Sequence, residues 1–370
     1  MLQRMKQNTL GQLLLIGVPG TELDSETAAI FRKVQPGGFI LFGRNIQSAQ
    51  QLRKLVDDLR DLSHTEPIIT IDQEGGRVSR LKLVGNEPPS AQQLREKGDL
   101  SLIHAHGRIT GELLRLFGFN LDLCPVLDIS FDDEADNSLR GRCYGKTVEH
   151  VVQFAGAFND ALLETGILTC GKHFPGYAAA SVDPHHYLPC INRSREELEK
   201  MELAIFRRFA PRVSSMMICH AWYPAFDSEE TPASLSRSIV TDFLVEDLGF
   251  GGMIMTDDLD MGAIMNKVSF KETIERAIRV GNHLAMVCHR INLAEEAFTI
   301  LQGLETPILD RALAGVARFK QTMVVPEAFS EERFYAVDQQ IWDLRVTTLG
   351  LEKAAQRSLE DRKRSPVETY

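Results

Sequence analysis

Two separate parts of the chain carry residue types that could perform proton transfer and nucleophilic attack. Asp183 and His185 stand two residues apart in a loop-like stretch that contains Gly176 and Pro184. An aspartate that hydrogen-bonds one imidazole nitrogen fixes the tautomer and leaves the other nitrogen free for proton transfer. Asp257 ends an apolar run elsewhere and offers a carboxylate nucleophile. A carboxylate nucleophile with a proton-transfer group is the minimum that cleavage of a glycosidic bond requires.

Eight short apolar runs recur along the chain at intervals that suit alternating strands and helices. Most consist of apolar residues without polar alternation, which is typical of parallel strands buried on both faces. Amphipathic segments separate them. Ser48 and Thr147 stand at the start of two predicted helices, Ser194 begins another with a capping box, and a further helix is expected near residues 239–248. The pattern predicts an α/β fold, a (β/α)8 TIM-type barrel. The runs span residues 12–18, 38–42, 67–72, 121–127, 167–172, 215–219, 252–257 and 284–288.

A doubly wound open sheet is the alternative architecture. It would carry a glycine-rich phosphate-binding turn after its first strand, and this chain has none there. No interdomain linker, low-complexity segment or solenoid repeat divides the chain. We therefore expect one barrel domain over residues 1–325, followed by a helical, charged C-terminal extension over residues 326–370.

Polar residues stand at the ends of several predicted strands. Asp72, Lys172, His173 and Asp257 each end or follow one of the apolar runs. In a TIM-type barrel the C-terminal ends of all strands meet at one face, where the catalytic residues gather. We therefore expect these side chains to line one cavity. His220 also follows a predicted strand and fits either a satisfied core histidine or a substrate contact.

The overall charge narrows the class of partner. The 370 residues include 41 basic and 51 acidic side chains, a formal net charge of −10. This balance argues against nucleic acid or an anionic membrane as the main partner, because both reward basic patches. No apolar stretch approaches the roughly 20 residues that a membrane span needs. The run at residues 13–16 is too short for a signal peptide and predicts the first strand instead. We expect a monomer or a weak oligomer.

The six cysteines are scattered without a CxxC pair or a repeated spacing. Several fall within the strand-like runs, as buried free thiols do. This usage predicts a reducing compartment, the cytoplasm, and no structural zinc site. No metal or organic cofactor is expected for the chemistry described above.

Six blocks of sequence, in order, are similar to one known family. They include I-D-Q-E-G-G-R-V-S-R, which contains Asp72 and Arg80, and K-H-F-P-G with the later D-x-H, which contains Lys172 and His185. The chain thereby resembles the single-domain bacterial β-N-acetylglucosaminidases of glycoside hydrolase family 3, enzymes of peptidoglycan recycling. The blocks span residues 37–45, 71–80, 124–128, 141–144, 172–185 and 248–259.

The resemblance implies specific roles at the matching positions. Asp257 would be the nucleophile of a retaining hydrolase that removes terminal, non-reducing β-linked N-acetylglucosamine. His185 would be the acid/base, held by Asp183. The resemblance also implies a set of residues that contact the sugar in the −1 subsite, namely Asp72, Arg80, Arg142, Lys172 and His173.

The chain departs from the family pattern at several positions. Tyr177-Ala178 replaces the usual His-Gly after Phe174-Pro175-Gly176, and Pro184 replaces the usual serine between the two dyad residues. His283 stands where the family has an acidic residue. These changes leave open a family-3 enzyme with another sugar preference, a phosphorylase, and a non-catalytic sugar-binding relative. The natural aglycone also stays open.

Overall fold

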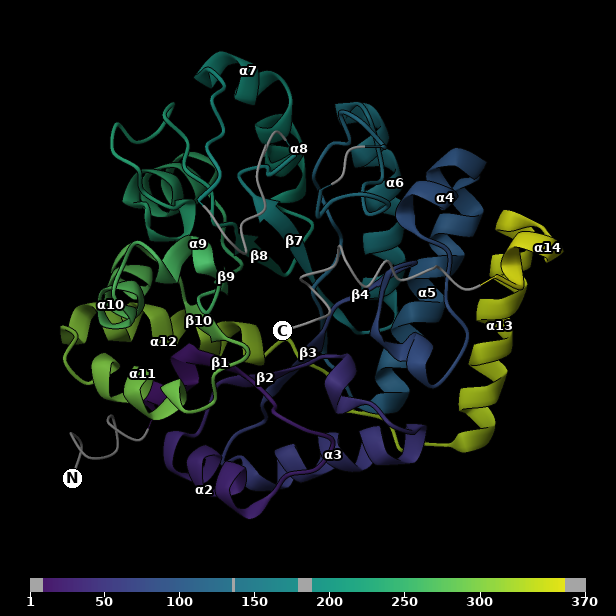
Figure 1. Ribbon diagram of the computed structural model, residues 1–370, viewed down its shortest axis with the longest axis horizontal. Helices are drawn as coiled ribbons and strands as arrows, with labels where there is room; N and C mark the ends of the chain where they lie inside the picture. The colour runs from purple at the N-terminus through teal and green to yellow at the C-terminus, as the bar shows by residue number, and fades with distance from the viewer. Residues whose placement is uncertain (1–8, 135–136, 179–187, 357–370) are drawn as a thin grey trace.

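The computed structural model describes residues 9–134, 137–178 and 188–356, and within them eight parallel strands form a closed barrel (Figure 1). The strands follow one another around the barrel in the order β1, β10, β9, β8, β7, β6, β3, β2. Each of the eight predicted runs contains one of these strands, so the predicted (β/α)8 barrel is confirmed. They are β1 Leu14–Gly17, β2 Gly38–Leu41, β3 Ile68–Ile71, β6 Leu121–Asp122, β7 Leu168–Phe174, β8 Ser215–Ile218, β9 Met253–Asp258 and β10 Leu284–Val287.

Continuous burial explains why these runs read as uninterrupted apolar sequence. Every residue of β1, β2 and β10 is buried, because one face of each strand lines the barrel interior and the other packs under the helices. The shortest strand is β6, two residues from Leu121 to Asp122. Pro125 follows shortly after and has no amide hydrogen to donate, so a regular ladder cannot continue through it.

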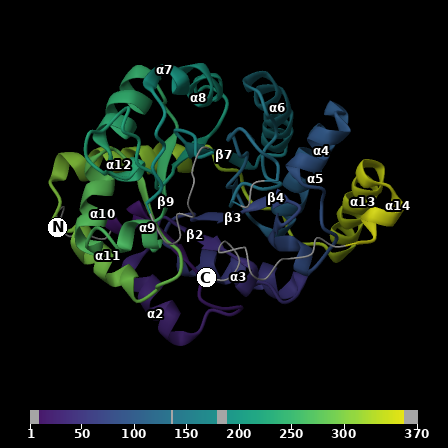
Figure 2. The same cartoon turned by 45° about the horizontal axis from the view of Figure 1, so that its top comes forward.

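Helices surround the barrel on all sides (Figure 2). Several begin as the sequence predicts: Ser48 and Ser194 form capping boxes, and Thr147 accepts a hydrogen bond from the His150 amide. The α-helices are α2 Ser25–Val34, α3 Ala49–Leu62, α4 Ala91–Lys97, α5 Leu100–Phe117, α6 Val148–Glu164, α7 Arg195–Lys200, α8 Glu202–Phe209, α9 Gly262–Met265, α10 Phe270–Arg279, α11 Leu293–Leu301, α12 Thr306–Lys320, α13 Glu331–Leu349 and α14 Leu351–Ala354. Short 3-10 segments are η1 Leu10–Leu13, η2 Gly43–Asn45, η3 Arg80–Leu83 and η4 Ala233–Leu235. None of the described helices combines the length and the apolar character that crossing a membrane requires.

Two helices differ from the sequence prediction. The helix expected to run on from Ser194 is divided into α7 and α8, because Met201 adopts a non-helical backbone (φ −122°, ψ −91°). The segment η5, Ser238–Asp247, is a π-helix and not an α-helix. Neither difference alters the placement of the strands between which these segments lie.

A small antiparallel hairpin beyond β3 was not predicted. It consists of β4, Gln73–Gly75, and β5, Val78–Ser79. The turn depends on Gly75 and Gly76, whose φ angles of 98° and 55° disfavour residues with a Cβ atom. A Cβ atom at Gly75 would also lie 2.4 Å from the carbonyl oxygen of Pro89, so the 85–90 segment packs closely behind the hairpin.

The last helices lie outside the ring, with α13 beside α4 and α5 (Figure 1). We propose that the barrel domain ends near residue 325 and that α13 begins a C-terminal extension. The extension is fastened by polar contacts. Asp338 accepts hydrogen bonds from the backbone and side-chain nitrogens of Asn86, at 2.6 and 2.7 Å.

A buried ion pair completes this connection. Arg345 Nη1 lies 2.9 Å from Glu87 Oε1 and 3.0 Å from the Glu87 carbonyl oxygen, and both residues are 3% exposed. The next residue, Pro88, accepts a hydrogen bond from the Gly76 amide in the hairpin turn. Helix α13 therefore holds the segment that supports the β4–β5 hairpin.

We predict that Arg345→Met lowers the free energy of unfolding by about 3–5 kcal/mol, because Glu87 would keep a buried charge without its partner. Urea denaturation monitored by circular dichroism measures the change. Arg207→Met is the matched control, because Arg207 pairs with Glu199 at an exposed site and should contribute less than about 1 kcal/mol. Equal small losses in both variants would contradict the prediction.

Candidate active site

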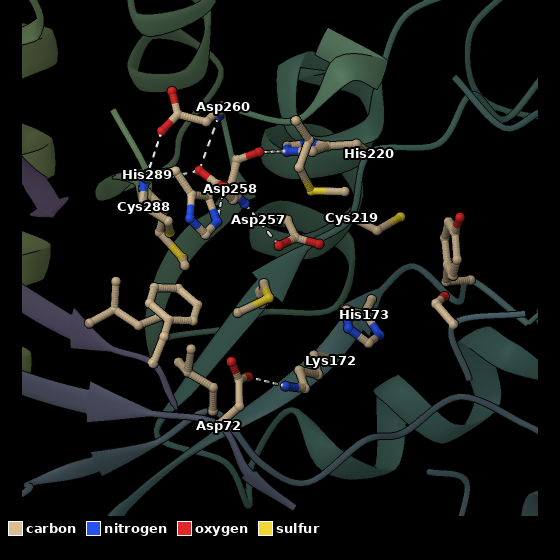
Figure 3. A pocket seen from close by; sticks show the side chains of 18 of the residues that line it. Asp72, Lys172, His173, Cys219, His220, Asp257, Asp258, Asp260, Cys288 and His289 are labelled. Carbon is tan, nitrogen blue, oxygen red and sulfur yellow. Dashed lines mark hydrogen bonds and ion pairs between the residues drawn. The ribbon is translucent and has the colours of Figure 1, made fainter. Parts of the chain in front are cut away.

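A cavity of about 340 Å³ opens at the C-terminal ends of the barrel strands. Its volume falls within the range of small-molecule sites. Of the predicted site residues, Asp72, Arg142, Lys172, His173 and Asp257 line it, and Figure 3 shows four of them around the same space. The fold thus brings together side chains that lie up to 185 positions apart in the sequence (257 − 72).

Three predicted residues are not among those that line the described cavity. Arg80 is buried and does not line the cavity, but its Nη2 atom lies 3.6 Å from Oδ2 of Asp72, which does. Asp183 and His185 lie outside the described residues.

Lys172 joins two buried carboxylates. Its Nζ atom lies 2.7 Å from Asp72 Oδ1 and 2.7 Å from Glu74 Oε1. Arg142 binds the same Glu74 in a bidentate manner, with Nε at 2.7 Å from Oε2 and Nη2 at 2.6 Å from Oε1. Such a bidentate pair fixes direction as well as distance. The result is an ionic cluster, formed by Asp72, Glu74, Arg142 and Lys172.

The charges in this ionic cluster stabilise one another against burial. Burial alone would raise the pKa of Glu74, but the adjacent Arg142 and Lys172 outweigh it and hold that pKa well below the usual range. Burial alone would lower the pKa of Lys172, but Asp72 and Glu74 raise it above its ordinary value. Glu74 and Lys172 are therefore charged at neutral pH, and the contacts among the four side chains fix their geometry before any ligand binds.

His173 is oriented by a carboxylate of its own. Its Nδ1 atom lies 2.7 Å from Asp128 Oδ2, and its backbone amide donates to the same oxygen at 3.1 Å. The other oxygen, Oδ1, accepts the backbone amide of Tyr177 at 2.6 Å. The carboxylate accepts a hydrogen bond from Nδ1–H, so the tautomer is set and Nε2 is left for the cavity.

Asp257 lies in strand β9 with its carboxylate partly accessible from the cavity. Its Oδ1 accepts the backbone amide of Asp258 at 2.8 Å. Burial would raise the pKa of Asp257, but the nearby imidazoles of His220 and His173, together with this amide and Lys172, hold it below the ordinary value. An ionised carboxylate facing a cavity can act as a nucleophile.

Asp258 has a different environment from its neighbour. Its Oδ1 accepts the backbone amides of Asp260 and Cys288, at 3.0 and 3.1 Å. Burial and the charge of Asp260, with a smaller effect of Asp257, raise the pKa of Asp258 to about 8. Asp258 therefore faces the backbone of the neighbouring strand and is a poorer nucleophile than Asp257.

The two histidines that the sequence left open can now be placed. His220 lines the cavity, and its Nδ1 and Nε2 atoms lie 2.8 Å from Ser234 Oγ and 2.8 Å from the Asp258 carbonyl oxygen. It is a satisfied histidine at the cavity wall. His283 precedes β10, at the opposite end of the barrel, where its Nδ1 accepts the Ile254 amide. Burial lowers the pKa of His283 to about 4, so it serves as a neutral structural residue.

Sequence reasoning missed two residues that organise the site, Glu74 and Asp128. Glu74 follows Asp72 by two positions, which places two carboxylates on the same side of an extended chain. That spacing was the available signal. Asp128 ends the block at residues 124–128, but only the folded chain shows that it contacts His173. Within the described ranges, no three His, Cys, Asp or Glu side chains are grouped so that they could hold a metal ion.

The chain is similar to known proteins over most of its length. Residues 5–317 match the model of the glycosyl hydrolase family 3 N-terminal domain. A β-hexosaminidase of Tolumonas auensis is 32% identical over 336 residues, covering 86% of this chain and 98% of the relative. A family 3 β-N-acetylglucosaminidase from Paenibacillus superimposes with a TM-score of 0.83 at 29% identity, covering 93% of this chain and 68% of the other. NagZ from Neisseria gonorrhoeae, solved with N-trifluoroacetyl-D-glucosamine, superimposes with a TM-score of 0.77 at 28% identity, covering 90% of this chain and 97% of the other.

We predict that Glu74→Gln destabilises the protein at neutral pH and that this loss shrinks in acid. The pKa of Glu74 is depressed in the folded state, so its stabilisation is fully present above its ordinary pKa of 4.5 and is lost as pH falls below that value. Urea denaturation at about pH 7 should give a difference of about 3–5 kcal/mol between wild type and variant. At about pH 4 the difference should be smaller.

Exposed Glu246→Gln is the control for this measurement, and it should change stability little at either pH. A Glu74→Gln deficit that stays constant or grows in acid would contradict the assignment of a depressed pKa to Glu74.

Proposed function

The chain belongs to glycosyl hydrolase family 3, and we propose that it is a β-N-acetylhexosaminidase that removes terminal, non-reducing β-linked N-acetylglucosamine with retention of configuration. The observation that carries this proposal is the position of Asp257. Its ionised carboxylate lies in a cavity of about 340 Å³, and the ionic cluster lies in the same cavity wall. This arrangement supports attack on the anomeric carbon of a bound sugar.

The first chemical step follows from this geometry. Asp257 attacks the anomeric carbon and forms a covalent glycosyl-enzyme, while the leaving oxygen takes a proton from a general acid. Water then releases the sugar from Asp257 with the same group acting as a base. Two inversions give net retention. The low pKa of Asp257 keeps the nucleophile ionised across the neutral range.

The ionic cluster is well suited to hold the sugar in the −1 subsite. Asp72 can accept hydrogen bonds from sugar hydroxyl groups, while Lys172 and Arg142 can donate them. Each of these groups is already held by a partner within 3 Å, so it loses little conformational freedom on binding. His173 adds an imidazole Nε2 at the same wall. Arg80 Nη2 contacts Asp72 Oδ2 and helps to hold that carboxylate in place.

We propose His185, held by Asp183, as the acid/base. The described part of the cavity also contains a histidine with a carboxylate partner, His173 with Asp128, which has the same chemical composition. His173 is therefore the alternative acid/base, and the kinetic experiment below separates the two. A free imidazole has a pKa near neutrality, which suits a group that must donate and later accept a proton.

Two further observations support the choice of acceptor and substrate. Lys172 and Arg142 line the cavity but are already paired with carboxylates, so neither offers an uncompensated charge to a phosphate acceptor. The neighbouring structure from Neisseria gonorrhoeae holds an N-acylated glucosamine, which supports an N-acetylated amino sugar. We propose peptidoglycan fragments as the source of that sugar. The six free cysteines support a reducing compartment, the cytoplasm.

We predict that Asp257→Ala lowers kcat on an aryl β-N-acetylglucosaminide by at least about 10³-fold, because the nucleophile is lost. Incubation of the wild type with a 2-deoxy-2-fluoro glycoside should add the mass of one sugar to the peptide that contains Asp257. Asp242→Ala, which removes an exposed partner of Arg237, is the control and should be fully active. Wild-type protein that never gains mass and never turns over would indicate a sugar-binding protein.

We predict that His185→Ala loses about 10²-fold or more in kcat/KM on glycosides with poorly acidic leaving groups. It should lose much less on dinitrophenyl glycosides, whose leaving groups need little protonation. His173→Ala should lose similar amounts on both, as expected for a sugar contact. The reverse pattern would transfer the acid/base role to His173. Release of a sugar 1-phosphate in phosphate buffer would identify a phosphorylase.

A further inference from the structure

His289 is a cavity residue to which the proposed mechanism gives no role. It directly follows Cys288 at the C-terminal end of β10, and its side chain is 22% exposed. Figure 3 shows its ring beside Asp258, on the same wall of the cavity as Asp257. His289 is neither the predicted nucleophile nor one of the residues predicted to contact the sugar.

The chemistry of its neighbours fixes the tautomer of His289. Arg44 Nη1 lies 2.9 Å from His289 Nδ1, and a guanidinium can only donate. Nδ1 must therefore be the acceptor, so the ring proton lies on Nε2. The Nε2 atom, which carries that proton, lies 3.3 Å from Asp258 Oδ2 and is in polar contact with it. The His289 ring thus connects the Arg44 guanidinium to the Asp258 side chain.

Arg44 is itself held in place. Its Nε and Nη2 atoms donate to the carbonyl oxygens of Val18 and Cys288, at 3.0 and 2.6 Å. These carbonyls follow strands β1 and β10, so the guanidinium connects the two neighbouring strand ends. The ring of Phe42 packs against both residues. Its centroid lies 4.4 Å from Arg44 Cζ and 5.1 Å from the centroid of the His289 ring.

Asp258 connects His289 to the proposed nucleophile Asp257 through a backbone hydrogen bond. Its side chain accepts the amides of Asp260 and Cys288 through Oδ1, and Oδ2 faces His289. Its backbone amide donates to Asp257 Oδ1 at 2.8 Å. A shift of Asp258 therefore shifts the donor that aims the Asp257 carboxylate, which must meet the anomeric carbon within a few tenths of an ångström.

We propose that Arg44, His289 and Asp258 form a positioning chain that aims the Asp257 carboxylate, with His289 as the positioning residue at its centre. This inference rests on the proposed role of Asp257 as nucleophile. Both nitrogens of His289 are engaged, so the residue is not an acid/base; it transmits the constraint of Arg44 to Asp258. Its effect should appear in kcat, which depends on the aim of the nucleophile, and not in the affinity for the sugar.

The test compares three substitutions at His289 on a 4-methylumbelliferyl β-N-acetylglucosaminide. His289→Gln places an amide donor near the former Nε2 position and should keep kcat within about threefold of wild type. His289→Asn reaches only as far as Nδ1, and His289→Leu has no donor. Both should lose about tenfold or more in kcat with KM changed less than about twofold.

Several outcomes would overturn the positioning chain. Wild-type kcat in His289→Leu would exclude it, and a change in KM alone would make His289 a substrate contact. Equal losses in the Gln and Asn variants, in step with a lower Tm, would indicate a purely structural role. His104→Leu, which removes a half-exposed histidine paired with Glu164, is the control and should leave kcat unchanged.

The experiment also separates failure of this inference from failure of the proposed function. If Asp257→Ala retains activity, Asp257 is not the nucleophile, and the chain has no nucleophile to aim. If Asp257→Ala is inactive while His289→Leu is fully active, only the positioning chain fails.

Discussion

The site depends on one lysine that lies between two buried carboxylates. Lys172 is 1% exposed and contacts Asp72 and Glu74 at 2.7 Å each. Removing these charges from water costs several kcal/mol per ion, and only mutual contacts at such distances offset that cost. Because each carboxylate comes from one part of the chain and the lysine from another, the cluster forms only when β3, its following hairpin and β7 are in register. The same contacts that permit burial also hold the polar atoms that face the cavity.

This constraint extends to parts of the molecule that are not in the barrel. Glu74 lies on the β4–β5 hairpin, whose turn requires two glycines and rests against the 85–90 segment. That segment is tied to α13 by Asn86 with Asp338 and by Glu87 with Arg345. Glu74, a residue of the site, is therefore supported indirectly by α13, a helix that follows the residues matched by the family model. The proposed C-terminal extension makes its polar contacts with the 85–90 segment that supports the β4–β5 hairpin, which a detached tail could not do.

Local patterns in the sequence sufficed for what depends on local physics. Continuous apolar runs located all eight barrel strands, and Ser48, Thr147 and Ser194 located helix starts correctly. Asp72 and Lys172 were expected to contact a ligand, but not each other, because the two residues are 100 positions apart. Asp128 escaped notice for the same reason, since its partner His173 is 45 positions away. The hairpin turn at Gly75 packs against the distant Pro89, which no local pattern records, and no local pattern marks the break at Met201.

Three aspartates within four residues, at 257, 258 and 260, pose a problem of like charges that the fold solves by giving each a different environment. Asp260 Oδ2 accepts the amides of His289 and Arg290, which stabilise its charge. Burial and the charge of Asp260 raise the pKa of Asp258 to about 8. Asp257 faces the imidazoles of His220 and His173 and the ammonium group of Lys172, which lower its pKa. As pH falls through the neutral range, Asp258 takes up a proton before Asp257 does, so the negative charge remains on the carboxylate that faces the cavity. Neighbouring groups whose pKa values are pushed apart in this way can take different roles, and here the separation favours Asp257 over Asp258 as the nucleophile.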